Sequence, residues 1–337
     1  MTLTFNSHPA PHIRYHESTR GIQGDVILSI FFVYAMAFYF YGPRTLLLAM
    51  VSVCCTVAAD VICVLLQGKK PNIRELSPLV TGLLIPLLLP ASIPFHVVGA
   101  AALFGILIAK QPFGGAGYNI FNPAAAGIAF VTVCFPTAVF SYPIPLEPLP
   151  ISPGTDLVLT NSPAFTLHLG GSPNYDWVEM ALGNIPGPLG ATHILVILAC
   201  LLYLILRGTV RWQLPVTFLV TFMAVCWLFP RAGMARLDTM LFEGMSGAIL
   251  LGGIFMLSDP VTSPQRDWSC AVYAALAAVI TFLFRRYGRL EEDFVFVLLL
   301  MNSTVWLFDS LGEQLAGWLR RRKFGTEFRQ KTKKKTQ

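Results

Sequence analysis

Long apolar runs separated by short polar segments fill most of the chain between residues 26 and 315. A helix needs about 20 residues to cross roughly 30 Å of hydrocarbon, and several runs approach this length. Two runs, 79–89 and 248–257, are shorter, so we interpret them as broken or re-entrant helices. The other runs are residues 26–41, 45–66, 95–109, 124–140, 193–206, 214–229, 268–284 and 294–308.

The pattern predicts an all-α polytopic membrane protein with about ten transmembrane segments. Five segments lie on each side of a long polar loop. The predicted parts are an N-terminal segment 1–25, a first five-helix repeat 26–140, a loop 141–190 on the far side of the membrane, a second five-helix repeat 191–315 and a basic tail 316–337.

Both short runs end in a Pro-x-x-x-Pro motif. The first reads Leu-Leu-Leu-Pro-Ala-Ser-Ile-Pro (87–94), and the second reads Met-Leu-Ser-Asp-Pro-Val-Thr-Ser-Pro (256–264). The same sequence interval separates Pro90 from Pro260 and Pro94 from Pro264, which indicates an internal repeat. Because each half holds an odd number of segments, the second copy must enter the membrane upside down. We therefore expect two inverted repeats with broken helices.

A glycine-rich break lies between the fourth and fifth apolar segments. Residues 112–127 read Pro-Phe-Gly-Gly-Ala-Gly-Tyr-Asn-Ile-Phe-Asn-Pro-Ala-Ala-Ala-Gly. Such backbone is tolerated at membrane depth only inside protein or beside a polar cavity, and two broken helices can satisfy each other's free N–H and C=O groups by meeting. We expect one polar site near the midplane, formed by Gly114, Gly115, Asn119, Asn122, Asp259, Thr262 and Ser263.

Composition and charge predict how the chain is oriented in the membrane. The chain is 55% hydrophobic and only 12% charged, which leaves no soluble domain of useful size. Residues 320–335 carry nine Lys or Arg, whereas the loop 141–190 carries none, so both termini are expected in the cytoplasm. Arg285, Arg286 and Arg289 then face outside, where the acids 291–293 balance their charge. The tail is interpreted as an orientation signal, with anionic lipid as an alternative partner, and no nucleic-acid partner is expected.

Few ionisable residues lie within the apolar runs. Asp60 is inside the second run, and we expect either an ion path, an ion pair with another subunit or an internal hydrogen bond. His8, His12 and His16 are separated by Pro9 and Pro11, which argues against a metal site. The seven cysteines form no Cys-x-x-Cys pair and are interpreted as free thiols. The sequence holds no catalytic motif of its own, so any chemistry must come from a cofactor.

Several motifs carry a family resemblance. Residues 110–124 (Lys-Gln-Pro-Phe-Gly-Gly-Ala-Gly-Tyr-Asn-Ile-Phe-Asn-Pro-Ala), 258–264 (Ser-Asp-Pro-Val-Thr-Ser-Pro), 299–302 (Leu-Leu-Met-Asn) and 323–325 (Lys-Phe-Gly) resemble the D subunits of the Rnf ion-translocating electron-transport complex. The B subunit of the sodium-translocating NADH:quinone reductase is a more distant likeness. The resemblance implies a fold related to urea transporters, a plasma (inner) membrane location, partner subunits and a relay of electrons through flavin.

The family carries FMN on a threonine of the outer loop, joined through a phosphoester. Residues 156–170 fit that pattern in register, with Ser162 at the hydroxyl position, Asn161 in place of a small residue and His168 in place of Lys. The resemblance therefore implies FMN on Ser162, added by a flavin transferase, with an ordinary turn as the alternative. A noncovalent riboflavin is implied for the cleft between the breaks. Ala191 stands where the family places a Glu.

Three functions follow from these observations. The first is a flavin-bearing subunit of an ion-translocating redox complex that couples electron transfer to Na⁺ or H⁺ transport. The second is a small-solute channel or transporter built on the same inverted-repeat plan. The third is a flavin-free scaffold that assembles the other subunits, which the departures at Ser162 and Ala191 favour.

Overall fold

The computed structural model describes residues 19–335 apart from 71, 73–74, 148 and 152–157, with side chains described up to residue 314. Helices account for most of this part of the chain. Its only sheet pairs β1 (Tyr142–Pro143) with β2 (Leu159–Thr160) in antiparallel register. The fold is therefore all-α apart from two very short strands in the 141–190 loop. His8, His12, His16 and Asp156 lie outside the described residues.

The helices before the loop form the first group. The Gly42 turn between its first two helices has a positive φ of 72°, a backbone conformation that glycine adopts without a steric penalty. The elements are α1 (Thr19–Tyr41), α2 (Arg44–Leu66), α3 (Ser77–Leu87), α4 (Phe95–Phe104), the π-helix η1 (Gly105–Lys110), the 3₁₀ turn η2 (Gln111–Phe113), α5 (Pro123–Cys134) and α6 (Pro136–Val139).

The second group follows two short helices of the loop, α7 (Pro163–His168) and α8 (Trp177–Leu182). Its short apolar helix is part of a bent pair, in which the segments 236–245 and 249–256 meet at 66°. The elements are α9 (Ile194–Leu206), α10 (Gln213–Leu228), α11 (Arg236–Met245), α12 (Ile249–Leu251), the π-helix η3 (Gly252–Met256), α13 (Asp267–Tyr287) and α14 (Phe294–Lys335).

Five of the described helices are long and apolar enough to cross a membrane, or six if the bent pair counts as one span. They are α1, α2, α4 continued through η1 and η2, α13 and the first part of α14. The remaining apolar helices, α3, α5, α9 and α10, are 10–17 residues long. The chain is thus built as a multi-pass membrane protein.

One predicted helix is divided in the structure. The apolar run 124–140 was expected to form a single segment, but α5 ends at Cys134 and α6 begins at Pro136. Proline has no N–H to continue the helical ladder, and its ring clashes with the preceding turn. The apolar pattern continues across this break because both pieces pack into the same core.

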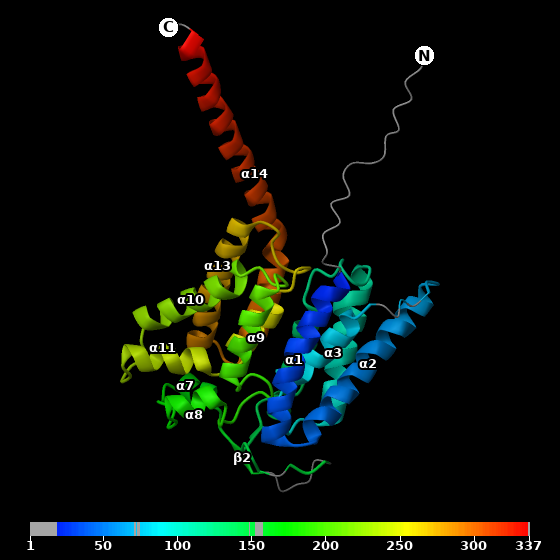
Figure 1. The fold of residues 1–337 in the computed structure, drawn as a ribbon. Coiled ribbons are helices and arrows are strands. Elements are labelled where there is room, and N and C mark those ends of the chain that lie inside the picture. Colours follow the sequence, from blue (N-terminus) through cyan, green and yellow to red (C-terminus); the bar gives the residue numbers. More distant parts are fainter. Residues whose placement is uncertain (1–18, 71, 73–74, 148, 152–157, 336–337) are drawn as a thin grey trace.

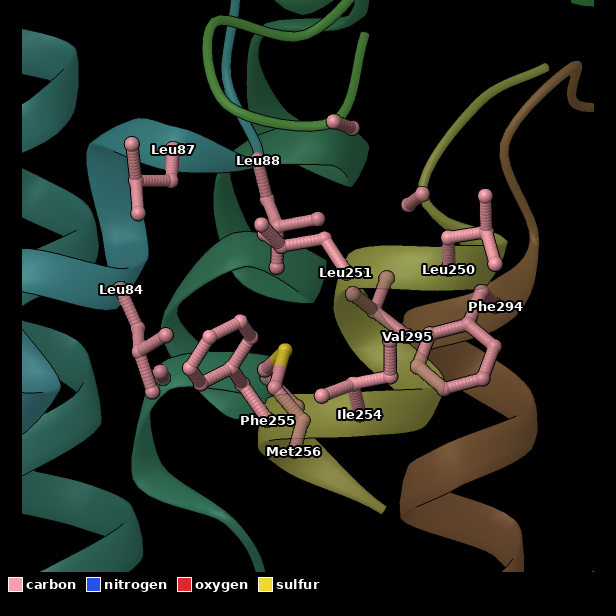
Figure 2. Close-up of a cluster of buried hydrophobic side chains, with 14 of the residues drawn as sticks. Leu84, Leu87, Leu88, Leu250, Leu251, Ile254, Phe255, Met256, Phe294 and Val295 are labelled. Atoms are coloured by element: carbon pink, nitrogen blue, oxygen red, sulfur yellow. The ribbon is translucent and has the colours of Figure 1, made fainter. Parts of the chain in front are cut away.

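Both short apolar helices pack into the centre of the molecule. Figure 2 shows Leu84 of α3 and Leu88, which follows this helix, beside Leu251 and Phe255 of the second group, all of them buried in one cluster with Phe294 of α14. The two groups therefore share a single apolar core. Burial of this kind stabilises the protein by about 25 cal/mol for each Å² of apolar surface removed from the solvent.

The start of α1 and the extension of α14 lie at the opposite end of the molecule from α7 and α8 of the loop. In Figure 1 the start of α1 and the extension of α14 lie at the top, and α7, α8 and β2 lie at the bottom. This arrangement matches the predicted relation between the basic tail and the Lys- and Arg-free loop, which places them on different sides of one bundle.

Candidate functional site

The glycine-rich break forms a tight turn that ends in a helix cap. Gly114, Gly115 and Gly117 all have positive φ, at 115°, 92° and 86°. Asn122 then caps α5, because its side-chain oxygen accepts from the backbone N–H groups of Ala124 and Ala125 at 3.0 and 3.2 Å. The asparagine and the following proline thus start the helix as their types predict.

The second break is closed by a short polar turn. Asp259 accepts from the backbone N–H of Val261 and from the Thr262 hydroxyl, both at 3.2 Å. Asp259 therefore satisfies the turn that follows η3, a local bond typical of Asp in turns.

The two breaks meet at a cavity of about 450 Å³. Asn119 and Asn122 line it from the first break, and Ser258 and Asp259 line it from the second. These four residues come from both breaks and line the same cavity. Gly114, Gly115, Thr262 and Ser263 were expected in the same site but do not line the cavity. The remaining walls are mainly apolar and come from α1, α3, α9 and η3.

Asn302 of α14 hydrogen-bonds to both breaks. In the amide orientation that satisfies its neighbours, it accepts from the Asn122 N–H at 2.9 Å and donates to the Thr262 carbonyl at 3.3 Å. The side chain is only 2% exposed. The sequence motif 299–302 contains this asparagine, but no local pattern indicates which two loops it connects.

The broken end of α3 is satisfied by the loop that leads into α9. Leu189 and Gly190 donate their N–H groups to the carbonyls of Leu89 and Leu87 at 2.9 and 2.8 Å. A Cβ on Gly190 would lie 2.7 Å from the Leu87 side chain, so the close approach requires glycine. The expectation that the breaks satisfy each other directly is therefore wrong at this end. Ala191 follows in the buried core, 1% exposed.

Asp60 belongs to a buried ion-pair network within this chain. Its Oδ1 lies 2.9 Å from the Lys110 Nζ and accepts from the Gln111 Nε2 at 2.6 Å. Lys110 is 1% exposed and also pairs with Glu75 at 2.9 Å. We call these four residues the Lys110 network. The partner of Asp60 is thus an internal lysine at the end of η1, which the sequence analysis missed because it lies fifty residues away.

Ser162 caps α7 and is buried. Its Oγ accepts from the Phe165 N–H at 2.9 Å and donates to the Glu291 Oε2 at 3.2 Å. The side chain is 2% exposed, so the expectation of a hydroxyl on an accessible loop is wrong for this conformation. Its neighbour Asp156 in the predicted motif lies outside the described residues.

A second buried ion-pair network lies at the bend between α11 and α12. Glu243 is 2.5 Å from Arg231 and 2.7 Å from Arg285. Arg285 also donates to the carbonyl and hydroxyl of Ser246. We call Glu243, Arg231 and Arg285 the Glu243 network. Arg285 was expected to face outside with its charge balanced by the acids 291–293, but it is 5% exposed and pairs with Glu243.

Comparison with known proteins gives related chains over nearly the whole length. A family described as NQR2, RnfD, RnfE matches residues 6–316. The D subunit of the Na⁺-translocating ferredoxin:NAD⁺ oxidoreductase complex of Acetobacterium woodii is 31% identical, over 92% of this chain and 93% of its own. The D subunit of the proton-translocating ferredoxin:NAD⁺ oxidoreductase complex of Clostridium ljungdahlii is 29% identical, over 96% of each chain. The D subunit of the ion-translocating oxidoreductase complex of Cronobacter sakazakii is 29% identical, over 91% and 97%.

Proposed function

Because this chain belongs to the NQR2, RnfD, RnfE family, we propose that it is a membrane subunit that holds a flavin and relays electrons within an ion-translocating redox complex. The relatives are named for complexes that translocate Na⁺ or H⁺ and carry out ferredoxin:NAD⁺ oxidoreduction. The partners of this chain are then the other subunits of an Rnf-type complex, and electron transfer through it is coupled to the transport of one of these ions.

The observation that carries the proposal is the cavity between the two breaks. Its volume of about 450 Å³ lies in the usual range for small-molecule sites, roughly 300–1,000 Å³. Asn119, Ser258 and Asp259 supply hydrogen-bonding groups, while Leu84 and Phe255 belong to the apolar wall. A noncovalent riboflavin suits this division, because its ring system is flat and largely apolar and its ribityl chain carries hydroxyl groups.

A flavin bound there would supply the electron-transfer chemistry, and the protein would supply position and surroundings. The amide of Asn119 and the carboxylate of Asp259 would bind hydroxyl groups at the polar end of the cavity. The walls from α3 and η3 would exclude water from the ring. Asn302 would fix the two breaks relative to each other, since it bonds to both.

Covalent FMN at Ser162 does not fit the described conformation. The serine oxygen caps α7 and faces the Glu291 carboxylate, which would repel an anionic phosphoester. Attachment would require α7 to separate from Glu291. Mass spectrometry of a peptide covering residues 156–168, from protein made with its partner subunits and a flavin transferase, tests this. An added FMN that Ser162→Ala abolishes would identify Ser162 as the acceptor.

The riboflavin site can be tested by filling the cavity. We expect riboflavin to remain with the purified complex and to be released by acid, where its fluorescence is measured. Val80→Trp places a large side chain into the cavity and is expected to remove the riboflavin. Val220→Trp on the exposed face of α10 is the matched control and is expected to retain it. Retention in Val80→Trp would contradict the site. If the purified wild-type complex contains no riboflavin, the flavin-free scaffold function is favoured instead.

Topology is the second part of the proposal. We place both termini in the cytoplasm, the 141–190 loop outside the plasma membrane and the two helix groups as inverted repeats related in fold to urea transporters. The basic tail and the Lys- and Arg-free loop support this orientation. In intact cells that carry a cysteine-free version of the chain, Ser172→Cys should react with an impermeant thiol reagent and Thr336→Cys should not. The reverse labelling would overturn the orientation.

A further inference from the structure

Three consecutive acids lie buried in the turn between α13 and α14. Glu291 and Asp293 are 5% and 7% exposed, and the carboxylate of Glu292 is turned inward. We call these three residues the acidic cluster. Each has one carboxylate oxygen, Oε1, Oε1 and Oδ2 in turn, that is buried without a hydrogen-bond partner among the described residues. Buried carboxylates are costly unless they are paired or protonated.

Nearby cations do not neutralise the cluster. Arg285 is the nearest guanidinium, but it forms its ion pair with Glu243 and its hydrogen bonds with Ser246. Arg231 likewise pairs with Glu243 and donates to the Leu167 carbonyl. Arg286 donates to carbonyl groups at the end of α10, and Arg289 is exposed. The four buried carboxylates of this region therefore face two buried guanidinium groups, which leaves an excess of negative charge.

Glu291 and Glu292 have polar contacts with the residues around them. Glu291 accepts from Ser162 at 3.2 Å and hydrogen-bonds with the Tyr142 phenol. Glu292 accepts from the Ala248 N–H at 2.9 Å. A Cβ on Gly247 would lie 2.0 Å from the Glu292 Oε1, so the absence of a side chain there makes room for the carboxylate. These contacts fix the Glu291 and Glu292 carboxylates in place.

A cavity of about 20 Å³ adjoins the cluster, lined by Tyr142, Thr132 and Glu292 among apolar neighbours. A single water needs about 10–15 Å³ of such space. The cavity therefore has room for one water molecule beside Tyr142 and Glu292.

We propose that the Glu291, Glu292 and Asp293 carboxylates form a proton-binding site, which stores exchangeable protons at the α7 end of the molecule. Protons, rather than a metal ion, match the geometry, because the described residues include no group of three ligands arranged to hold a metal. A proton on a carboxylate oxygen removes the excess charge and turns the unpartnered acceptor into a donor for its neighbour.

Titration behaviour agrees with this assignment. Burial, and next to it the charge of Glu292, raises the pKa of Glu291 to about 7 and that of Asp293 to about 7. Burial also raises the pKa of Glu292. The Arg285 charge and the hydrogen bonds from Tyr142 and Ser162 act in the opposite direction on Glu291 but are outweighed. Protons thus bind and leave in the neutral range.

Infrared spectroscopy of the purified full-length chain tests the proposal directly. The carbonyl stretching band of protonated carboxyl groups is followed between pH 5 and 9. We expect the wild type to show a component that titrates near pH 7 and is absent from Glu291→Gln combined with Asp293→Asn. Glu147→Gln, at an exposed acid of the 141–190 loop, is the matched control and should keep the component. If the component that titrates near pH 7 is still present in the double variant, the proposal is overturned.

Two further measurements keep the test decisive. Tyr142→Phe removes the hydrogen bond that lowers the pKa of Glu291, so the midpoint should rise if the component belongs to this cluster. An unchanged midpoint would contradict the assignment even if the double variant did not fold. The titration is then repeated with NaCl in place of choline chloride. A midpoint that Na⁺ lowers would show a metal cation competing for the carboxylates and would overturn the assignment to protons alone.

Discussion

The Lys110 network and the Glu243 network are buried charge clusters at opposite ends of the molecule, and they differ in how completely they are satisfied. Lys110 lies within 2.9 Å of two carboxylates, and Gln111 adds a donor to one of them. Glu243 holds two guanidinium groups, yet the acidic cluster beside it keeps three unpartnered oxygens.

This difference separates a structural network from a reactive one. A network whose charges are paired and hydrogen-bonded holds elements together. A network with excess buried carboxylates changes its protonation near neutrality, because desolvation and like charge both disfavour the ionised form. The Lys110 network therefore joins α2 to η1, and the acidic cluster has a chemical role.

Removing the centre of the Glu243 network should have the largest effect. Glu243→Gln removes the carboxylate that pairs with both Arg231 and Arg285, and breaking a buried ion pair in this way costs about 3–5 kcal/mol. We expect a large drop in the melting temperature. It is measured from the tryptophan fluorescence of the purified chain during heating. Glu313→Gln, whose partner Arg266 is 3.7 Å away at an exposed site, is the control and should melt like the wild type. Equal melting temperatures for the two variants would contradict a stabilising role of the buried Glu243 ion pairs.

A smaller loss is expected in the Lys110 network. Lys110→Met leaves Asp60 and Glu75 without their cation, at a cost of about 1–3 kcal/mol for buried polar groups that lose their partner. Adding Asp60→Asn should recover part of the stability, because it removes one of the uncompensated charges. Strictly additive losses in this double-mutant cycle would show that the two residues do not interact.

Ser162 connects the acidic cluster to α7, and its removal should cost about 1 kcal/mol, the usual value for a helix N-cap. Ser162→Thr retains an oxygen acceptor and should cost less than Ser162→Ala. Amide hydrogen exchange at Phe165, whose N–H is bonded to the serine oxygen, reports the change locally. An unaltered exchange rate in Ser162→Ala would mean that the cap does not form.

Glu291→Gln sharpens the comparison through its pH dependence. The pKa of Glu291 is raised by burial from 4.5 to about 7, so between these values the folded protein holds a proton that the unfolded chain has released. Stability contributed by the neutral carboxyl is complete below about pH 4.5 and is lost as the pH rises through 7. Unfolding midpoints at pH 5 and pH 8 should therefore differ more in the wild type than in Glu291→Gln. Glu313→Gln, at an exposed acid, should leave this difference unchanged, whereas equal differences in the wild type and Glu291→Gln would refute the shift.

Local sequence patterns predicted much of the architecture and some of the site. Apolar runs set the positions of the helices, and the Pro-x-x-x-Pro motifs located the ends of α3 and η3. Asn122 and Pro123 predicted the start of α5, since capping depends on a few neighbouring residues. The meeting of Asn119 and Asn122 with Asp259 followed from the cost of unsatisfied backbone at membrane depth, a constraint that sequence alone conveys.

The pairing of distant charges was decided only by the tertiary structure. Nothing near Asp60 in the chain indicates Lys110, and nothing near Arg285 indicates Glu243, because ion pairs depend on which helix faces meet in the bundle. Ser162 shows the same limit: its motif predicted a hydroxyl on an open loop, whereas packing of α7 against the turn 288–293 buried it beside Glu291. The sequence by itself determined which segments are apolar and where they break. Which polar groups face each other there depends on long-range packing, and so does the protonation that their burial imposes.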